Sequence, residues 1–524
     1  MLRAAFGKVP DPNYFDGDMN YIRAYYDFRR DKGLDPFLID EITWNDLDMD
    51  RIFKRINPKR CTSGEQYLYY MLRSPVLDAD GYTQRKDLIE SMQADPERRL
   101  KVETILARLG CTRRADLCRA FYPSEHGVGR LFLYLACLIL FIVSLICAIQ
   151  RISFVPFFLS LLLNCFLHEF GKRSSQKDYD TVNYVVSMVF ALKKIRKLHD
   201  ADLDKQMCRA YESLDRLQAV IRTGGVSTGL DSGGVEDAIL TVTLLDLIAY
   251  EYLKNKLGRC HDDVFAIHES LGRLDAAISI ASYRASLDHY TEPLLDFDSE
   301  HRCMIRGEAL LHPLLADPVP NDCVTERPIL ITGSNASGKS TYLKTVALAA
   351  IMAQTICTVL ANRYEANAFR VFSSMALQDD LLAGESYYIV ETRSLKRILD
   401  AAKESRAILC VVDEVLRGTN TVERIAASSE VLQAIADKGF LCLAATHDIE
   451  LCDLLQGSYR LCHFEEQVTK NEMLFDYVIR EGKATSRNAI NLLQIIGFDR
   501  QIVEKAHEKA ERYLETGVWR PSDS

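Results

Sequence analysis

A glycine-rich stretch in the C-terminal half of the chain has residue types and spacing suited to holding phosphate. Residues 333–340 read GSNASGKS, a gapless match to G-x-x-x-x-G-K-[ST]. The glycines let backbone N–H groups turn toward phosphate oxygens, the Lys339 ammonium neutralises the β- and γ-phosphates, and the Ser340 hydroxyl ligates Mg²⁺. A chance glycine-rich turn is the alternative. The residues expected to contact the nucleotide are Gly333, Ser334, Asn335, Ala336, Ser337, Gly338, Lys339, Ser340 and Thr341.

Two later stretches place acidic and imidazole side chains directly after apolar runs. Residues 407–412 (AILCVV) are followed by Asp413 and Glu414, and residues 440–445 (FLCLAA) are followed closely by His447. Asp413 is suited to hold Mg²⁺ through water, and Glu414 is suited to polarise an attacking water as a general base. A lone histidine would mean little, but after two matched motifs His447 is placed to sense the γ-phosphate. The pattern predicts a site for ATP and Mg²⁺, with Glu414, Lys339 and His447 catalytic and Ser340 and Asp413 as metal ligands.

Strands and helices must position these side chains. Residues 329–332 (ILIT) read as a buried strand before the loop, and residues 341–353 read as a helix after it, whose N-terminus favours anions. The two later apolar runs read as buried strands, and α/β sheets bind ligands at the carboxyl ends of their strands. The expected fold class is an α/β ATPase domain with a P-loop and a mixed sheet flanked by helices. An all-α core or lever domain, interrupted by a hydrophobic helical hairpin, is expected to precede it.

The expected hairpin consists of two apolar runs. Residues 131–149 (LFLYLACLILFIVSLICAI) carry no charge, and residues 152–170 (ISFVPFFLSLLLNCFLHEF) stay uncharged until Glu169. About 20 apolar residues suffice to cross a bilayer. A buried helix pair in a soluble core is the alternative, and it is stronger for the second run. Both flanks are expected to belong to one cytosolic ATPase, so the consistent count is two spans, with membrane contact through residues 131–149 and 152–168.

The flanking charges and the composition bear on location. Arg130, Lys172 and Arg173 at the outer ends, against Arg151 at the turn, agree with the positive-inside rule. The 15 cysteines form no C-x-x-C pair, which argues against a zinc ribbon and fits a reducing compartment. No secretory signal peptide is evident. We therefore expect an inner- or plasma-membrane protein with both soluble parts facing the cytoplasm; a cytoplasmic protein is the alternative.

Together these motifs resemble the MutS family of mismatch-repair ATPases, a branch of the ABC-type ATPases. TGSNASGKSTYLKTVALAAIMAQ is similar to the family's phosphate loop and next helix, DEVLRGTNTVERIAAS to its carboxylate pair and acceptor loop, and ATHDIEL to its switch-histidine segment. Residues 377–391 resemble its signature segment. The resemblance implies a homodimer with composite ATP sites, in which Ser386 of one subunit contacts the γ-phosphate held by the other.

The resemblance covers roughly residues 35–115 and 265–515, with departures. The loop reads S-N-A-S where repair proteins typically read P-N-M-G. Residues 318–321 (PVPN) lie where the family often presents an aromatic side chain to adenine, so base stacking there is not expected from the resemblance. Only about 35 residues precede the core, where the family carries its mismatch-reading domain. The F-x-E string Phe464-Glu465-Glu466 lies inside the ATPase domain and is not that domain's wedge.

The expected domains are 1–34, an N-terminal extension; 35–125, the first part of the helical core; 126–173, the transmembrane hairpin; 174–300, the second part of the core; and 301–524, the ATPase domain. Two outputs stay open. The first is a membrane-anchored, ATP-hydrolysing dimeric clamp on duplex or branched DNA, which the family core favours. The second is a membrane-associated ABC-type mechanoenzyme or motor subunit that does not bind DNA. The hairpin and the net charge of −9 favour the second output.

Overall fold

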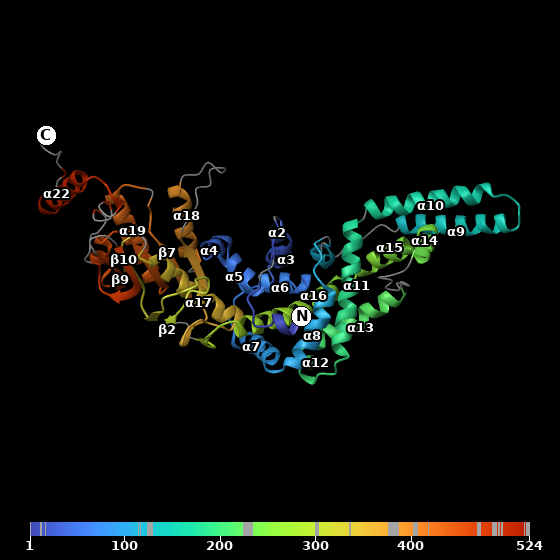
Figure 1. Ribbon diagram of the computed structural model, residues 1–524, viewed down its shortest axis with the longest axis horizontal. Coiled ribbons are helices and arrows are strands. Elements are labelled where there is room, and N and C mark those ends of the chain that lie inside the picture. The colour runs from blue at the N-terminus through green and yellow to red at the C-terminus, as the bar shows by residue number, and fades with distance from the viewer. Residues whose placement is uncertain are drawn as a thin grey trace. The chain divides into compact units, whose positions relative to one another are not determined.

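The structure is a computed structural model, drawn in Figure 1. It describes residues 2–10, 13–15, 17–113, 115, 117–122, 129–174, 176–223, 234–298, 303–334, 337–375, 387–401, 407–417, 419–468, 473–484, 490, 493, 496–517 and 519. The chain forms two compact units. Unit 1 comprises residues 1–34, 55–70 and 88–286, and unit 2 comprises residues 35–54, 71–87 and 287–524.

Unit 1 is helical over the residues that the structure describes. Its longest helix, α16 (His261–Ala285), contributes a nearly continuous set of buried residues and packs against α13, α11 and α8. Charges inside this unit are paired, since buried Arg60 bonds both Glu103 and Asp275. The helices are α1 (Leu2–Ala5), α2 (Asp18–Ile22), α3 (Ala24–Lys32), α8 (Pro96–Leu109), η1 (Leu117–Phe121), α9 (Gly129–Ile149), α10 (Val155–Ser174), α11 (Gln176–Arg196), α12 (Ala201–Gln206), α13 (Cys208–Thr223), α14 (Gly234–Thr243), α15 (Leu245–Leu257) and α16; α5 (Met49–Ile56), α6 (Thr62–Arg73) and α7 (Ala79–Ala94) have residues in both units.

Helices α9 and α10 occupy the two predicted apolar runs and lie side by side (Figure 1). The chain reverses between them near Arg151, which has a φ of 57°. Among the described residues, α9 alone is long and apolar enough to cross a membrane, and 28% of its most apolar stretch is buried. The second predicted span does not reach this standard, because α10 also contains Asn164, His168 and a charged last turn.

Polarity in this helix pair is arranged with polar groups inside and apolar groups outside. Ser160, Asn164 and His168 recur every four residues on α10, and each is at most 4% exposed. Ser160 bonds Ser144 (2.8 Å), Asn164 Nδ2 donates to the Val242 carbonyl (2.7 Å), and His168 Nε2 lies 2.9 Å from Asp246. The large apolar residues exposed on this segment are Phe132, Leu133, Ile139, Leu140, Ile142, Val143, Leu145, Ile146, Ile149, Ile152, Phe154, Val155, Phe158, Leu159, Leu162, Leu163, Phe166 and Phe170.

Unit 2 is built around two sheets. The larger has the order β10-β9-β4-β8-β7-β6, in which β9 through β6 run parallel and β10 pairs antiparallel with β9. The smaller has the order β1-β5-β2-β3. The strands are β1 (Leu294–Asp296), β2 (Ile305–Leu310), β3 (Asn321–Thr325), β4 (Ile329–Thr332), β5 (Arg363–Asn367), β6 (Arg370–Ser374), β7 (Ile408–Asp413), β8 (Leu441–Thr446), β9 (Arg460–Val468) and β10 (Met473–Glu481).

Helices cover the central strands of the larger sheet, whose β4 and β8 are fully buried runs, as expected for parallel strands packed on both faces. Helix α17 packs against β7 and β8, α18 against β6, and α19 against β8. Helix α4 belongs to the same unit and contacts β6. The helices of this unit are α4 (Glu41–Asp46), α17 (Lys339–Ile356), α18 (Tyr387–Asp400), α19 (Thr421–Asp437), α20 (Glu450–Leu455) and α22 (Arg500–Thr516).

The strand and helix predictions around the motifs are confirmed. Residues 329–332 form β4, and the two later apolar runs form β7 and β8. The expected mixed sheet with flanking helices is also present. The compact units group residues 35–54 and 71–87 with the sheets. A pattern of helical periodicity cannot show which of two cores a helix joins.

Candidate nucleotide site

Residues 333–338 connect β4 to α17 at the carboxyl edge of the larger sheet. Gly333 and Gly338 have φ values of 150° and 104°, in the left-handed region that glycine adopts without strain. A Cβ on Gly333 would also lie 3.0 Å from Ser337 Oγ and 3.1 Å from the Phe464 carbonyl oxygen. The backbone conformation at these two positions therefore depends on glycine.

Lys339 begins α17 and its ammonium lies within the loop. Its Nζ donates to the carbonyl oxygens of Gly333 (2.9 Å) and Ser334 (2.7 Å). Burial lowers the pKa of Lys339, although the carboxylates of Asp413 and Glu414 partly oppose this. A buried ammonium held by two carbonyls is a strong partner for phosphate oxygens.

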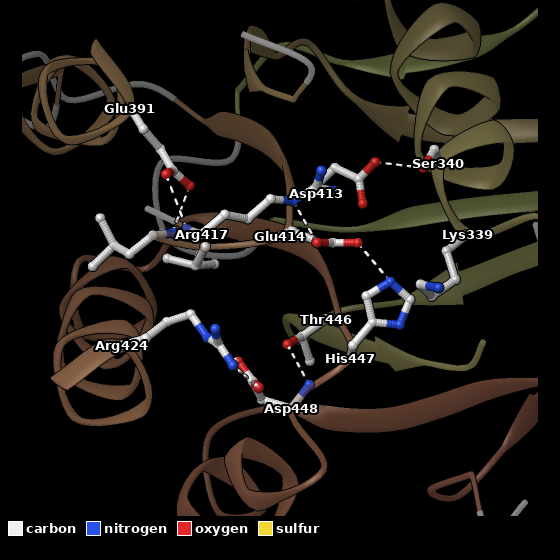
Figure 2. Close-up of polar contacts among 12 residues, drawn as sticks. Lys339, Ser340, Glu391, Asp413, Glu414, Arg417, Arg424, Thr446, His447 and Asp448 are labelled. Carbon is white, nitrogen blue, oxygen red and sulfur yellow. Dashed lines mark hydrogen bonds and ion pairs between the residues drawn. The ribbon is translucent and has the colours of Figure 1, made fainter. Parts of the chain in front are cut away.

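Ser340 and Asp413 are brought together from α17 and the end of β7 (Figure 2). The Ser340 hydroxyl donates to Asp413 Oδ2. Asp413 Oδ1 is buried and has no hydrogen-bond partner among the described residues. A buried carboxylate oxygen beside a hydroxyl is the type of oxygen donor that Mg²⁺ prefers, so this pair fits the metal that the motif implies.

Glu414 is held between His447 and Arg417, as Figure 2 shows. His447 Nε2 lies 2.6 Å from Glu414 Oε1, and His447 Nδ1 lies 2.9 Å from the Gly333 carbonyl oxygen. Arg417 pairs with the other carboxylate oxygen. Burial by itself raises the pKa of Glu414, but the His447 hydrogen bond and the charges of His447, Arg417 and Lys339 outweigh it, so the pKa lies below the usual value. Glu414 is therefore ionised at neutral pH, as a general base requires.

The carboxylates of Glu391 and Asp448 make hydrogen bonds that fix the segments around Glu414 and His447 (Figure 2). Glu391 on α18 accepts the backbone N–H groups of Leu416 and Arg417. Asp448 accepts Arg424 Nε and Nη2 at 2.9 and 2.6 Å, which joins α19 to the residue after His447. The interpretation from sequence assigned no role to Arg424 or Asp448, since each lies on a different element from its partner.

A cavity of about 470 Å³ opens beside the glycine-rich loop. Its lining combines the predicted loop residues and Glu414 with side chains from β2, β9, β10 and the segment before β3. The Ser337 hydroxyl lines it and is 1% exposed, without a hydrogen-bond partner in the described part of the chain. The lining residues are Leu310, His312, Leu315, Asp317, Pro318, Val319, Asn321, Ser337, Gly338, Lys339, Ser340, Thr341, Tyr342, Thr345, Glu414, Arg417, Phe464 and Tyr477.

Tyr477 is an aromatic lining residue that the sequence interpretation missed. It lies on β10 where the register with β9 shifts, and its φ is 57°. Asn321 fixes this conformation: its Nδ2 donates to the Tyr477 carbonyl (2.9 Å), and its Oδ1 accepts the Ile479 N–H (2.8 Å). The string FDYVIREG shows no sign of this, because the bulge and the contact of β10 with Asn321 on β3 are tertiary features.

His312 is a second missed lining residue. It is 8% exposed, and its Nδ1 accepts the Leu314 N–H at 3.2 Å. Burial lowers its pKa to about 4, with a further contribution from Lys344. His312 is therefore a neutral ring at physiological pH and contributes an aromatic wall to the cavity.

The structure gathers Gly333, Ser334, Ser337, Gly338, Lys339, Ser340, Thr341, Asp413, Glu414 and His447 around this edge of the sheet. Ser334 also donates to Glu466 on β9 at 2.9 Å, a contact available to serine at that loop position. The predicted residues Asn335, Ala336 and Ser386, together with Gly418 of the acceptor loop, lie outside the described residues.

Comparison with known proteins supports the interpretation of unit 2. A model of the family "MutS domain V" matches residues 329–514. The chain is 36% identical over 271 residues to a DNA mismatch repair protein MutS from Geobacillus thermodenitrificans, covering 49% of this chain and 29% of that protein. It is 33% identical over 275 residues to one from Thermosipho melanesiensis, covering 51% and 33%. It is 32% identical over 268 residues to DNA mismatch repair protein MutS 2 from Halobacterium salinarum, covering 49% and 30%. The chain thus spans about a third of the length of these relatives.

Proposed function

We propose that this chain is a divergent ATPase of the MutS family and that its residues bind and hydrolyse ATP as follows. The observation that carries the proposal is the convergence of the Lys339 ammonium, the Ser340–Asp413 pair and the ionised Glu414 at one edge of the sheet. Phosphate groups bind at the glycine-rich loop, where Lys339 and the Ser337 hydroxyl, which has no partner among the described residues, donate to them.

Ser340 and Asp413 would hold Mg²⁺, which supplies charge neutralisation at the β- and γ-phosphates. Glu414 accepts a proton from the attacking water, and its lowered pKa keeps it ready to do so. His447 holds one Glu414 oxygen and the Gly333 carbonyl, so it senses changes at the loop. The base of the nucleotide would fit in the same cavity, whose wall includes Tyr477 and the neutral ring of His312.

The ATPase is proposed to act on DNA. The relatives named above are DNA mismatch repair proteins, and the family resemblance implies a homodimer whose ATP sites are shared, with Ser386 completing the partner's site. A dimer that closes on ATP would clasp duplex or branched DNA between its helical parts.

The test is the ATPase rate of the full chain with and without linear, mismatched and branched duplex DNA at low salt. We expect stimulation that fades as salt rises, because phosphate contacts release counterions. The DNA clamp is rejected if the wild-type ATPase rate is the same with every DNA while Glu414→Gln abolishes that rate, which shows that the activity belongs to this protein. The chain would then be an ATPase that acts on something other than DNA.

A second element of function is a membrane anchor, favoured by the inverted polarity of α9 and α10. Their outward faces carry large apolar side chains, whereas Ser160, Asn164 and His168 face the inside. In a bilayer, polar side chains face the bundle interior and apolar ones face lipid. Twenty-one residues of α9 give about 31 Å at 1.5 Å per residue, enough for the hydrocarbon core.

The anchor is tested by alkaline carbonate extraction of membranes from cells producing the full chain. We expect the protein to stay in the membrane pellet and to need detergent for release. Release of the folded protein by carbonate alone would show that the apolar faces are covered in some other way.

A further inference from the structure

The loop that follows the general base is left-handed at two residues. Glu414 and Leu416 have φ values of 56° and 58°, conformations that side-chain-bearing residues adopt only when their surroundings hold them. A left-handed Leu416 turns the N–H groups of Leu416 and Arg417 to the same side, and successive N–H groups arranged in this way bind anions. The loop therefore creates an anion-binding concavity directly beside the catalytic carboxylate.

The anion in that concavity is the carboxylate of Glu391. Its Oε1 accepts the Leu416 N–H at 2.5 Å and its Oε2 accepts the Arg417 N–H at 3.1 Å. The Glu391 side chain is 3% exposed, so these two bonds are made away from water. A carboxylate satisfies both donors at once, whereas an amide offers a single acceptor oxygen and sets its own NH₂ against the second N–H.

Glu391 lies on α18, a helix that is fixed by core packing and by a hydrogen bond to β6. Leu395 and Ile398 of α18 are buried in the core below the sheet, and Arg397 of the same helix donates to the Ser373 carbonyl at the end of β6. The loop has further ties, since Glu414 N donates to Ala445 O (2.9 Å) and Ser428 Oγ donates to Val415 O (3.1 Å). These two hydrogen bonds fix Glu414 and Val415, and the bonds to Glu391 fix Leu416 and Arg417.

We propose that Glu391 is a positioning residue for ATP hydrolysis, which fixes the loop 414–417 so that Glu414 and Arg417 keep the geometry needed for proton abstraction. Glu391 is buried and bonds two backbone N–H groups of the loop, so it acts through the loop. The inference rests on the proposed role of Glu414 as general base.

The test compares Glu391→Gln with a control on the same helix, Ile398→Val, in the full chain. Ile398 is fully buried in the hydrophobic core, so its variant lowers Tm without altering the loop's hydrogen bonds. For Glu391→Gln we expect kcat to fall at least tenfold while the KM for ATP and the affinity for a fluorescent ATP analogue change less than twofold. For Ile398→Val we expect a lower Tm with kcat and KM unchanged.

A structural role alone gives a different pattern. If Glu391→Gln lowers Tm and weakens ATP binding in parallel with kcat, or leaves kcat unchanged, the positioning role is overturned. Glu391→Asp, which keeps the charge but is one methylene shorter, is expected to recover part of kcat and serves if the glutamine variant does not fold. Glu414→Gln in the same assay separates the two ideas: normal turnover there refutes the general base, whatever Glu391→Gln does.

Discussion

Replacing Asn321 by alanine tests how the cavity recognises the base of the nucleotide. Asn321 is the link between β3 and the bulge of β10, through its bonds to Tyr477 O and Ile479 N. A net hydrogen bond contributes about 0.5–1.5 kcal/mol, so losing both costs about 1–3 kcal/mol. Without them, the positive φ of Tyr477, a conformation that costs about 1–3 kcal/mol, is no longer enforced.

The expected result is weaker ATP binding with little change in chemistry. If about 1–2 kcal/mol of the loss falls on ATP binding, KM for ATP rises about 5- to 30-fold, since 1.4 kcal/mol is a factor of ten. The kcat at saturating ATP stays near the wild-type value, because Asn321 acts on β10 through its bonds to Tyr477 O and Ile479 N. The measurement is steady-state ATP hydrolysis together with calorimetric binding of a non-hydrolysable ATP analogue.

Three further variants dissect the effect. Asn321→Asp keeps the acceptor for Ile479 N but sets a carboxylate oxygen against Tyr477 O, so it should raise KM at least as much as Asn321→Ala. Tyr477→Ala should match Asn321→Ala in KM, whereas Tyr477→Phe retains the ring and should resemble wild type. The reasoning is refuted if Tyr477→Ala leaves KM unchanged, or if Asn321→Ala lowers kcat while KM stays constant.

The remaining predictions concern the Arg424–Asp448 pair, pH and the apolar helix pair. Arg424→Met, which breaks the pair with Asp448, should lower kcat severalfold with KM unchanged, measured by steady-state hydrolysis. An equal loss of nucleotide affinity would speak against a role of this pair in placing His447. Because the pKa of Glu414 is lowered in the folded state, its stabilising contribution is present above its ordinary pKa of 4.5 and is lost as pH falls through the folded value. In denaturant melts, the free energy of unfolding of Glu414→Gln should therefore fall less at acid pH than that of wild type. Identical dependence of this free energy on pH in the two proteins would contradict the prediction. Leu162→Lys on the exposed face of α10 should reduce membrane retention, since lysine at the centre of a span costs about 2.5–3.5 kcal/mol. Leu34→Lys, at an exposed leucine elsewhere in unit 1, is the control and should not reduce it. Equal retention of the two variants in carbonate extraction would argue against insertion of α10.

The parts of the site that sequence could predict are those carried by short contiguous motifs. The glycine-rich loop with its lysine, and the apolar runs that end at Asp413 and before His447, define strand–loop and strand–helix units whose geometry is local. Parallel strands then bring their carboxyl ends to one edge, which places Asp413 near Ser340. Local patterning was sufficient here because the backbone itself positions the groups.

The residues that sequence could not predict act across elements distant in the chain. Asn321 and Tyr477 are 156 residues apart and meet only where β3 and β10 approach. Glu391 lies in the segment that resembles the family's signature, but its carboxylate accepts a hydrogen bond from the loop after Glu414. The same limit applies to residues 35–54, whose helical pattern was compatible with either unit.

The most direct test of the account is single-turnover ATP hydrolysis by wild-type protein and by Glu414→Gln, each in detergent and with Mg²⁺. Both proteins are expected to bind ATP with similar affinity, because Lys339 and the loop are intact in both. Only wild type is expected to release phosphate, since the variant lacks the base beside His447. Phosphate release by Glu414→Gln at the wild-type rate would contradict the central claim that Glu414 activates the attacking water.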